Sequence, residues 1–218
     1  MKINRYIDHT LLKAEQTDSD ISLLCGEAVK YEFYSVCVNP CWVSSAKNFV
    51  KHSNVKVVSV VGFPLGANRM EVKMREAVIA VEDGADEIDM VMNIGEFKSG
   101  NYESVLNEII GVREAVSGKI LKVIVETSLL TENEKAKALE IVIKSKADFI
   151  KTSTGFSTGG ALVSDIELFH RLSSGKVKIK ASGKIRDYKT AEAMIKAGAS
   201  RIGTSSSILI MAQADECS

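Results

Sequence analysis

Short apolar runs rich in β-branched residues alternate along the chain with longer amphipathic stretches. Runs of this length predict strands, and apolar residues at helical spacing predict helices. We expect strands at Tyr6–Thr10, Tyr34–Val38, Val57–Phe63, Glu87–Asn93, Leu121–Glu126, Phe149–Ser153, Val177–Ala181 and Arg201–Thr204. A strand followed by a helix is a βα unit, and its crossover requires parallel strands.

Helix signals fill the spaces between these strands. Capping boxes at Thr131–Glu134 and Ser164–Glu167 predict two helix starts. Helical spacing covers Asn68–Glu82, Tyr102–Val116 and Tyr188–Lys196. Eight βα units favour a closed (β/α)8 TIM barrel over an open sheet. The sequence shows no linker or shift in composition, so we expect residues 1–218 to form one α/β barrel domain.

The composition is that of an ordinary globular protein. Lys plus Arg and Asp plus Glu both total 28, which gives no support for nucleic acid or a membrane surface as a partner. The first residues lack the apolar region of a signal peptide, and no run approaches the ~20 apolar residues of a membrane span. Cys37 and Cys41 resemble half a metal site but have no partner pair at zinc spacing. We therefore expect a cytoplasmic protein with free thiols, no metal and no cofactor.

Charged residues recur on one face of the predicted strands. Lys151 and Lys180 lie near the ends of two apolar runs, and hydroxyl residues and glycine follow them. The strand period of two places Asp89 on the same face as Glu87 and opposite to Ile88. In a barrel the apolar face packs on the helices, so the charged face points inward. We expect Lys151, Lys180 and Asp89 to meet at the C-terminal mouth, where barrel enzymes hold their active sites.

Two neighbouring lysines suggest an amine nucleophile that forms a Schiff base with a carbonyl substrate. A free lysine has a pKa of ~10.4, and a nearby like charge with partial burial lowers that pKa by several units. Lys180 is the expected like charge beside Lys151. Asp89 opposes this effect, so we expect it nearer Lys180 than Lys151, or acting through water as a proton relay. The alternative is that both lysines lie on the rim with their ammonium groups in water.

Glycine-containing loops follow the last three predicted strands, at Thr154–Gly160, Ser182–Arg186 and Gly203–Ser206. Backbone N–H groups in such loops and at helix N-termini bind phosphate, and late loops are the usual phosphate site of a barrel. Turn formation alone is the alternative. Among weaker candidates, a lone His9 is more often structural than catalytic, and Glu126 is a candidate partner for a lysine.

Seven motifs between Asp8 and Ser206 resemble those of the deoxyribose-phosphate aldolase family. They are Asp8-His-Thr-Leu-Leu-Lys13, Cys37-Val-Asn-Pro40, Val61-Gly-Phe-Pro-Leu-Gly66, Glu87-Ile-Asp-Met90, Lys122-Val-Ile-Val-Glu-Thr127, Phe149-Ile-Lys-Thr-Ser-Thr-Gly155 and Arg201-Ile-Gly-Thr-Ser-Ser206. The resemblance implies a class I aldolase that interconverts 2-deoxy-D-ribose 5-phosphate with acetaldehyde and D-glyceraldehyde 3-phosphate without a metal. It implies that Lys151 forms the Schiff base, Lys180 perturbs its pKa and Asp89 serves proton transfer.

The same resemblance implies the substrate contacts. The positions that match phosphate-binding residues are Gly155, Gly183, Gly203, Ser205 and Ser206. The positions that match residues near the substrate are Asp8, Thr10 and Cys37. The implied partners are small-molecule phosphosugar and aldehyde substrates, and a homodimer is left open.

Three positions depart from the family pattern. Many members have a second glycine where Lys184 stands, and Leu162 stands where threonine is common. Some members end in a tyrosine that assists proton transfer, whereas this sequence ends in Cys217 and Ser218. We expect Lys184 to lie near the substrate phosphate, with its ammonium adding a contact. A left-handed backbone there would cost lysine ~1–2 kcal/mol.

Other readings of the site differ in the residues they need. A phosphosugar isomerase on the same barrel would use a carboxylate base and need no neutral lysine. A non-catalytic phosphosugar-binding barrel would keep the glycine loops and tolerate the loss of Lys151.

Overall fold

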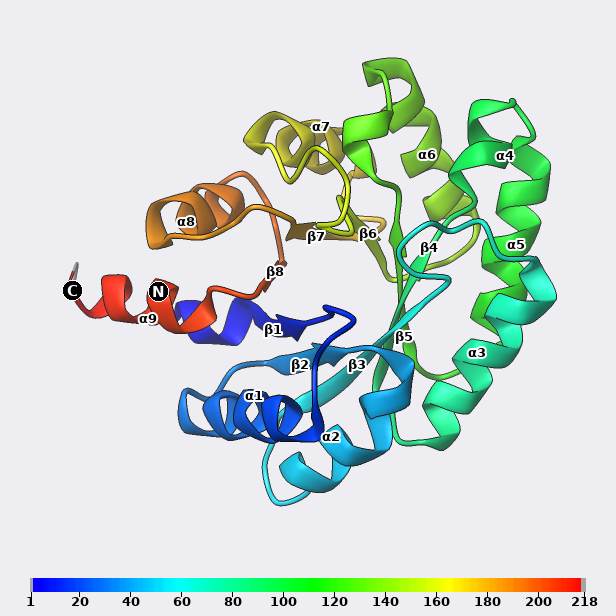
Figure 1. Cartoon of the computed structure of the whole chain (residues 1–218). Helices are drawn as coiled ribbons and strands as arrows, with labels where there is room; N and C mark the ends of the chain where they lie inside the picture. Colours follow the sequence, from blue (N-terminus) through cyan, green and yellow to red (C-terminus); the bar gives the residue numbers. More distant parts are fainter. Residues whose placement is uncertain (1, 217–218) are drawn as a thin grey trace.

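The computed structural model describes residues 2–216, so the departure at Cys217 and Ser218 lies outside the described residues. Parallel strands pair in sequence order and close into a barrel, with the first strand hydrogen-bonded to the last (Figure 1). The strands are β1 (Ile7–Leu11), β2 (Ser35–Val38), β3 (Lys56–Val61), β4 (Glu87–Val91), β5 (Ile120–Ile124), β6 (Phe149–Lys151), β7 (Lys178–Ser182) and β8 (Arg201–Thr204). The predicted (β/α)8 barrel is confirmed.

Helices surround the strands (Figure 1). They are α1 (Asp18–Lys30), α2 (Val43–Val50), α3 (Met70–Glu82), α4 (Ile94–Lys98), α5 (Tyr102–Ala115), α6 (Glu132–Lys144), α7 (Val163–Ser173), α8 (Tyr188–Lys196) and α9 (Ser207–Glu216), with short 3₁₀ turns η1 (Ile3–Tyr6), η2 (Pro40–Trp42) and η3 (Thr127–Leu129). Within residues 2–216, no helix has the length and apolar character that crossing a membrane would need.

One of the two predicted capping boxes is confirmed. The Thr131 hydroxyl accepts the Glu134 N–H, and the Glu134 carboxylate accepts the Thr131 N–H, at the start of α6. The box predicted at Ser164 is wrong, because α7 begins earlier and Leu162 occupies the N-cap without a side-chain hydrogen bond. The Ala161 N–H donates to the Gly183 carbonyl, and this contact fixes the chain just before Leu162.

Two apolar regions lie on opposite faces of the strands. The large one fills the layer between strands and helices and includes Ile88, Met90 and Ile150. The small one lies inside the barrel and consists of Leu12, Cys37, Val58 and Val60, with Phe63 packed against it. Most charged strand residues are also buried, namely Asp8, Glu87, Asp89, Lys122, Lys151, Lys180 and Arg201, whereas Lys56 and Lys178 at the strand starts are exposed. The predicted alternation of β4, apolar outward and acidic inward, is therefore confirmed.

Candidate active site

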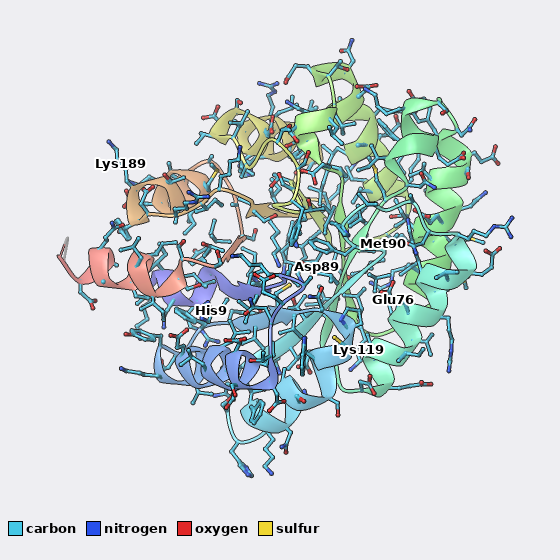
Figure 2. The ribbon with its side chains drawn as sticks, viewed as in Figure 1. His9, Glu76, Asp89, Met90, Lys119 and Lys189 are labelled. Atoms are coloured by element: carbon cyan, nitrogen blue, oxygen red, sulfur yellow. The ribbon has the colours of Figure 1, made fainter. Side chains whose placement is uncertain are left out.

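Lys151, Lys180 and Asp89 meet inside the barrel, as their positions on three strands predict. Lys151 of β6 lies in register with Lys180 of β7, and all three side chains are buried. Asp89 Oδ2 accepts hydrogen bonds from Lys151 Nζ at 2.7 Å and from Lys180 Nζ at 2.8 Å. Figure 2 shows Asp89 near the centre of the molecule.

The expected position of Asp89 nearer to Lys180 is wrong. One carboxylate oxygen bonds both lysines directly, at nearly equal distances. The physical reason is that β4 faces β6 and β7 across a barrel interior too narrow to keep the three side chains apart. The reading that places both lysines on the rim in water is also wrong, because Lys151 is 3% exposed and Lys180 is fully buried.

Burial lowers the pKa of Lys151 from its ordinary value. The missing hydration of the ammonium is the largest cause, the Asp89 carboxylate opposes it, and the Lys180 ammonium adds to it. The like charge named from the sequence therefore contributes, but the low-dielectric interior contributes more. The pKa of Lys180 moves in the opposite direction: burial lowers it, yet Asp8 and Asp89 outweigh burial and raise it well above the usual range. Lys180 therefore holds its proton more tightly than a free lysine does, and Lys151 holds its proton less tightly.

A cavity of about 360 Å³ opens above Lys151 at the C-terminal end of the barrel. The predicted residues that line it are Thr10, Lys151, Gly155, Gly183, Lys184, Gly203 and Ser205. Asp8, Cys37, Asp89 and Lys180 are not among the lining residues and are fully buried, so Lys151 is the predicted catalytic residue that reaches the cavity. Ser206 is also not among them, and its N–H already donates to the Thr204 hydroxyl at 2.9 Å. The cavity thus brings the three glycine loops to one place beside the lysine.

Lys184 adopts the left-handed backbone conformation, which is strained for a non-glycine residue. Its φ is 60°, directly after Gly183 with a φ of 88°. Its ammonium donates a hydrogen bond to the carbonyl of Thr158 in the preceding glycine loop. A Cβ added to Gly160 would come within 2.6 Å of the Gly183 carbonyl oxygen, so the two loops pack backbone to backbone. Lys184 therefore ties together the two loops that form one wall of the cavity.

Two weaker candidates have structural roles. Glu126 has a left-handed backbone, and its carboxylate accepts the Thr154 N–H at 3.1 Å and the Thr154 hydroxyl at 2.5 Å. Its predicted pairing with a lysine is wrong, because the chain turns away from β5 before this residue. His9 lies between Glu27 and Ser207, with 2.8 Å hydrogen bonds to both, which is the structural role expected for it.

Three residues near the site are not predicted from the sequence. Lys122 and Arg201 are buried cations inside the barrel, and Phe156 lines the cavity. Isolated cations among apolar neighbours on β5 and β8 were the available signal for the first two. The Phe156 and Phe63 rings pack in a T-shaped pair with 5.2 Å between ring centroids, so the mouth has an apolar side.

Comparisons with known proteins agree with this geometry. The model of the DeoC/LacD family of aldolases matches residues 3–211. The chain is 55% identical to a deoxyribose-phosphate aldolase of Finegoldia magna over 97% of this chain and 99% of that protein. It is 52% identical to a deoxyribose-phosphate aldolase of Streptococcus suis over 99% of both chains.

Solved structures show the same fold. The aldolase QR15 superposes with a TM-score of 0.95 at 44% identity, covering 98% of this chain and 96% of that one. A deoxyribose phosphate aldolase of Aeropyrum pernix, described as tetrameric, superposes with a TM-score of 0.91 at 33% identity, covering 99% and 92%. With a family model that spans nearly its whole length and relatives above half identity, this chain belongs to the DeoC/LacD family of aldolases.

Proposed function

We propose that this protein is a class I deoxyribose-phosphate aldolase. It cleaves 2-deoxy-D-ribose 5-phosphate reversibly to acetaldehyde and D-glyceraldehyde 3-phosphate through a Schiff base on Lys151. The observation that carries the proposal is a buried lysine with a lowered pKa at the base of a cavity walled by glycine loops. The names of the relatives at 52–55% identity support the same substrate.

The chemistry begins with the neutral Lys151 amine. It attacks the aldehyde carbon of the open-chain sugar, and loss of water gives a protonated imine. The hydroxyl on C3 then gives up its proton, the C2–C3 bond breaks, and its electrons flow into the imine to give an enamine. D-glyceraldehyde 3-phosphate leaves, C2 of the enamine takes a proton, and water releases acetaldehyde. The iminium is the electron sink, so the reaction needs no metal.

Asp89 and Lys180 serve the proton transfers in this proposal. Asp89 is hydrogen-bonded to Lys151, and it shares the same oxygen with Lys180. Protons therefore have a short path between the two amines and water at the cavity, with Asp89 as the acceptor. Asp8 and Asp89 raise the pKa of Lys180 against burial, so a proton that Lys180 passes on is quickly regained, and its positive charge then opposes a proton on Lys151.

The phosphate lies at the glycine loops in this proposal. Gly155, Gly183, Gly203 and Ser205 line the cavity, and the last two begin the segment that leads into α9. Backbone N–H groups with such neighbours suit a dianion. Lys184 adds positive charge at the same wall. Ser206 stays a predicted contact whose N–H would have to leave Thr204.

Reductive trapping tests the proposal. Borohydride with acetaldehyde should give a single two-carbon adduct by intact mass, and peptide mapping should place it on Lys151. Lys151→Ala should lose both the adduct and sugar cleavage. An adduct on Lys180 would reverse the two roles. A wild-type protein without any adduct would favour the phosphosugar isomerase or the binding barrel.

We further propose that the protein acts in the cytoplasm as one domain on small phosphosugars and aldehydes. The single closed barrel formed by residues 2–216 supports the one-domain part of this assignment. The homodimer stays a prediction, and light scattering after size exclusion would measure it.

A further inference from the structure

Six buried charged side chains close into a ring inside the barrel. In order around the ring they are Asp8, Lys180, Asp89, Lys122, Glu87 and Arg201, and each forms an ion pair with both neighbours. The contacts measure 2.8 Å for Lys180–Asp89, 2.7 Å for Asp89–Lys122, 2.6 Å for Lys122–Glu87, 3.4 Å for Glu87–Arg201 and 2.7 Å for Arg201–Asp8. The sixth contact joins Asp8 to Lys180 and closes the ring.

The ring alternates in sign, with three carboxylates and three cations, so its own net charge is zero. Lys151 is attached to it from outside, through the 2.7 Å contact with Asp89. Lys151 is thus the seventh charge, and it has no carboxylate of its own. An unbalanced charge in a dry interior is costly, and the cost is removed when the group becomes neutral. The six ring residues and Lys151 have zero net charge together only when Lys151 is a neutral amine.

We propose that the closed ring sets how readily Lys151 loses its proton, and that Arg201 and Glu87 act through it as positioning residues. These two side chains are absent from the cavity lining, so they act at a distance from the substrate. The inference rests on the proposed role of Lys151 as the nucleophile. It attributes the easy loss of the Lys151 proton to all the charges of the ring, rather than to Lys180 alone.

Every strand contributes to the surroundings of Lys151. Charged groups come from β1, β4, β5, β7 and β8, β2 adds the buried thiol of Cys37, and β3 adds Val58 and Val60. The guanidinium carbon of Arg201 lies 3.4 Å from the centroid of the Tyr34 aromatic ring and 5.6 Å from that of Phe149. These aromatic faces hold the guanidinium in place without adding charge.

The pKa directions of the cations agree with this count. Burial lowers the pKa of Arg201, but Asp8 and Glu87 outweigh burial and raise it. Burial likewise lowers the pKa of Lys122, but Asp89, Glu87 and Asp8 together outweigh burial, so this pKa also rises. Lys180 behaves in the same way. Among the four cations, Lys151 alone has a lowered pKa.

Two substitutions that change the net charge of the ring in opposite directions test the proposal. Arg201→Gln leaves the ring with a net charge of −1, which favours the Lys151 ammonium. The acidic limb of kcat/KM should then move to higher pH by about one unit, the size expected for one charge acting through a buried network. Glu87→Gln leaves the ring at +1 and should move the limb to lower pH by a similar amount. The double variant restores neutrality and should return the limb close to wild type.

Control variants separate charge from structure. Arg201→Lys keeps the charge and should keep the wild-type limb. Lys135 and Asp165 form a 2.6 Å buried pair between α6 and α7, outside the barrel interior. Lys135→Met and Asp165→Asn should lower stability without moving the limb. If Arg201→Gln does not fold, the isosteric Glu87→Gln decides the question alone.

The readout is the pH dependence of kcat/KM together with the rate at which acetaldehyde and cyanoborohydride alkylate Lys151. Opposite shifts of both profiles in the two single variants support the ring. A Lys151 adduct that forms with unmoved limbs in the folded single variants would overturn the ring and leave the aldolase assignment intact. Shifts in the same direction would also overturn it. No Lys151 adduct in wild type at any pH would overturn the nucleophile assignment and the ring with it.

Discussion

Ile88 and Asp89 are consecutive residues of β4, yet they belong to two buried regions that work differently. Ile88 faces the helices in the large apolar layer, where burial of apolar surface area stabilises the fold. Asp89 faces the interior and bonds three lysines. The apolar layer supplies the stability that lets the interior hold charges whose desolvation is unfavourable.

The outer layer also contains a buried ion pair, and it differs from the ring. Lys73 on α3 bonds Glu108 on α5 at 2.7 Å, and the Glu108 carboxylate also accepts the Asn93 N–H at 3.0 Å. Lys73 further donates to the Val91 carbonyl at 2.9 Å. One cation meets one anion there, so neither charge is in surplus. Burial lowers the pKa of Lys73 as well, with Glu108 opposing it, but Lys73 has two acceptors and does not line the cavity, so this pair supports structure.

The largest effect is expected inside the barrel. Asp89→Asn removes the carboxylate shared by three lysines and the acceptor for proton transfer. Cleavage of deoxyribose phosphate should fall by about 10²–10⁴-fold in kcat, the range for loss of a general acid–base group. Stability should fall by ~3–5 kcal/mol because buried ammonium groups lose their partner. A folded variant with near wild-type kcat in steady-state assays would show that the charged interior does not need Asp89 for catalysis.

The neighbouring residue should behave in the opposite manner. Ile88→Ala leaves a cavity in the outer layer and should lower the free energy of unfolding by ~2–5 kcal/mol in urea titrations. Well below its melting temperature, this variant should keep the wild-type kcat and the same acidic limb. A limb that moves as far as in the ring variants would show that packing, rather than charge, controls Lys151.

The smallest effect is expected at the rim, which belongs to neither region. Lys184→Gly removes a charge beside the predicted phosphate position and the contact with Thr158, and it relieves a left-handed backbone worth ~1–2 kcal/mol. KM for deoxyribose phosphate should rise several-fold, and KM for unphosphorylated deoxyribose much less. An unchanged KM for the phosphorylated sugar would limit Lys184 to its loop contact.

The short apolar runs rich in β-branched residues were enough to predict every strand of the barrel. The errors lie at strand ends. The sequence predicts a strand over Val57–Phe63, but β3 ends at Val61 because Gly62 turns the chain with a φ of 63°. Leu121–Glu126 likewise ends early at Ile124, and Glu126 is left-handed. Buried loop residues continue the apolar pattern after the hydrogen-bonded ladder has stopped.

The candidate site was predictable only in part, for a geometric reason. Strand period shows which face carries Lys151, Lys180 and Asp89. It does not show which residues meet across the interior, because that depends on the stagger of strands far apart in sequence. The bond from Asp89 to both lysines, and the inclusion of Lys122 and Arg201, follow from barrel closure.

The origin of the ring charges has a consequence for how the chain can be divided. All three carboxylates come from β1 and β4, and all the cations, Lys151 included, come from β5–β8. The amino-terminal half barrel therefore carries an acidic inner surface, and the carboxy-terminal half carries a basic one. Neither half can neutralise its inner surface alone, but each is the electrostatic complement of the other. Assembly of the two halves and the creation of a reactive amine are the same event.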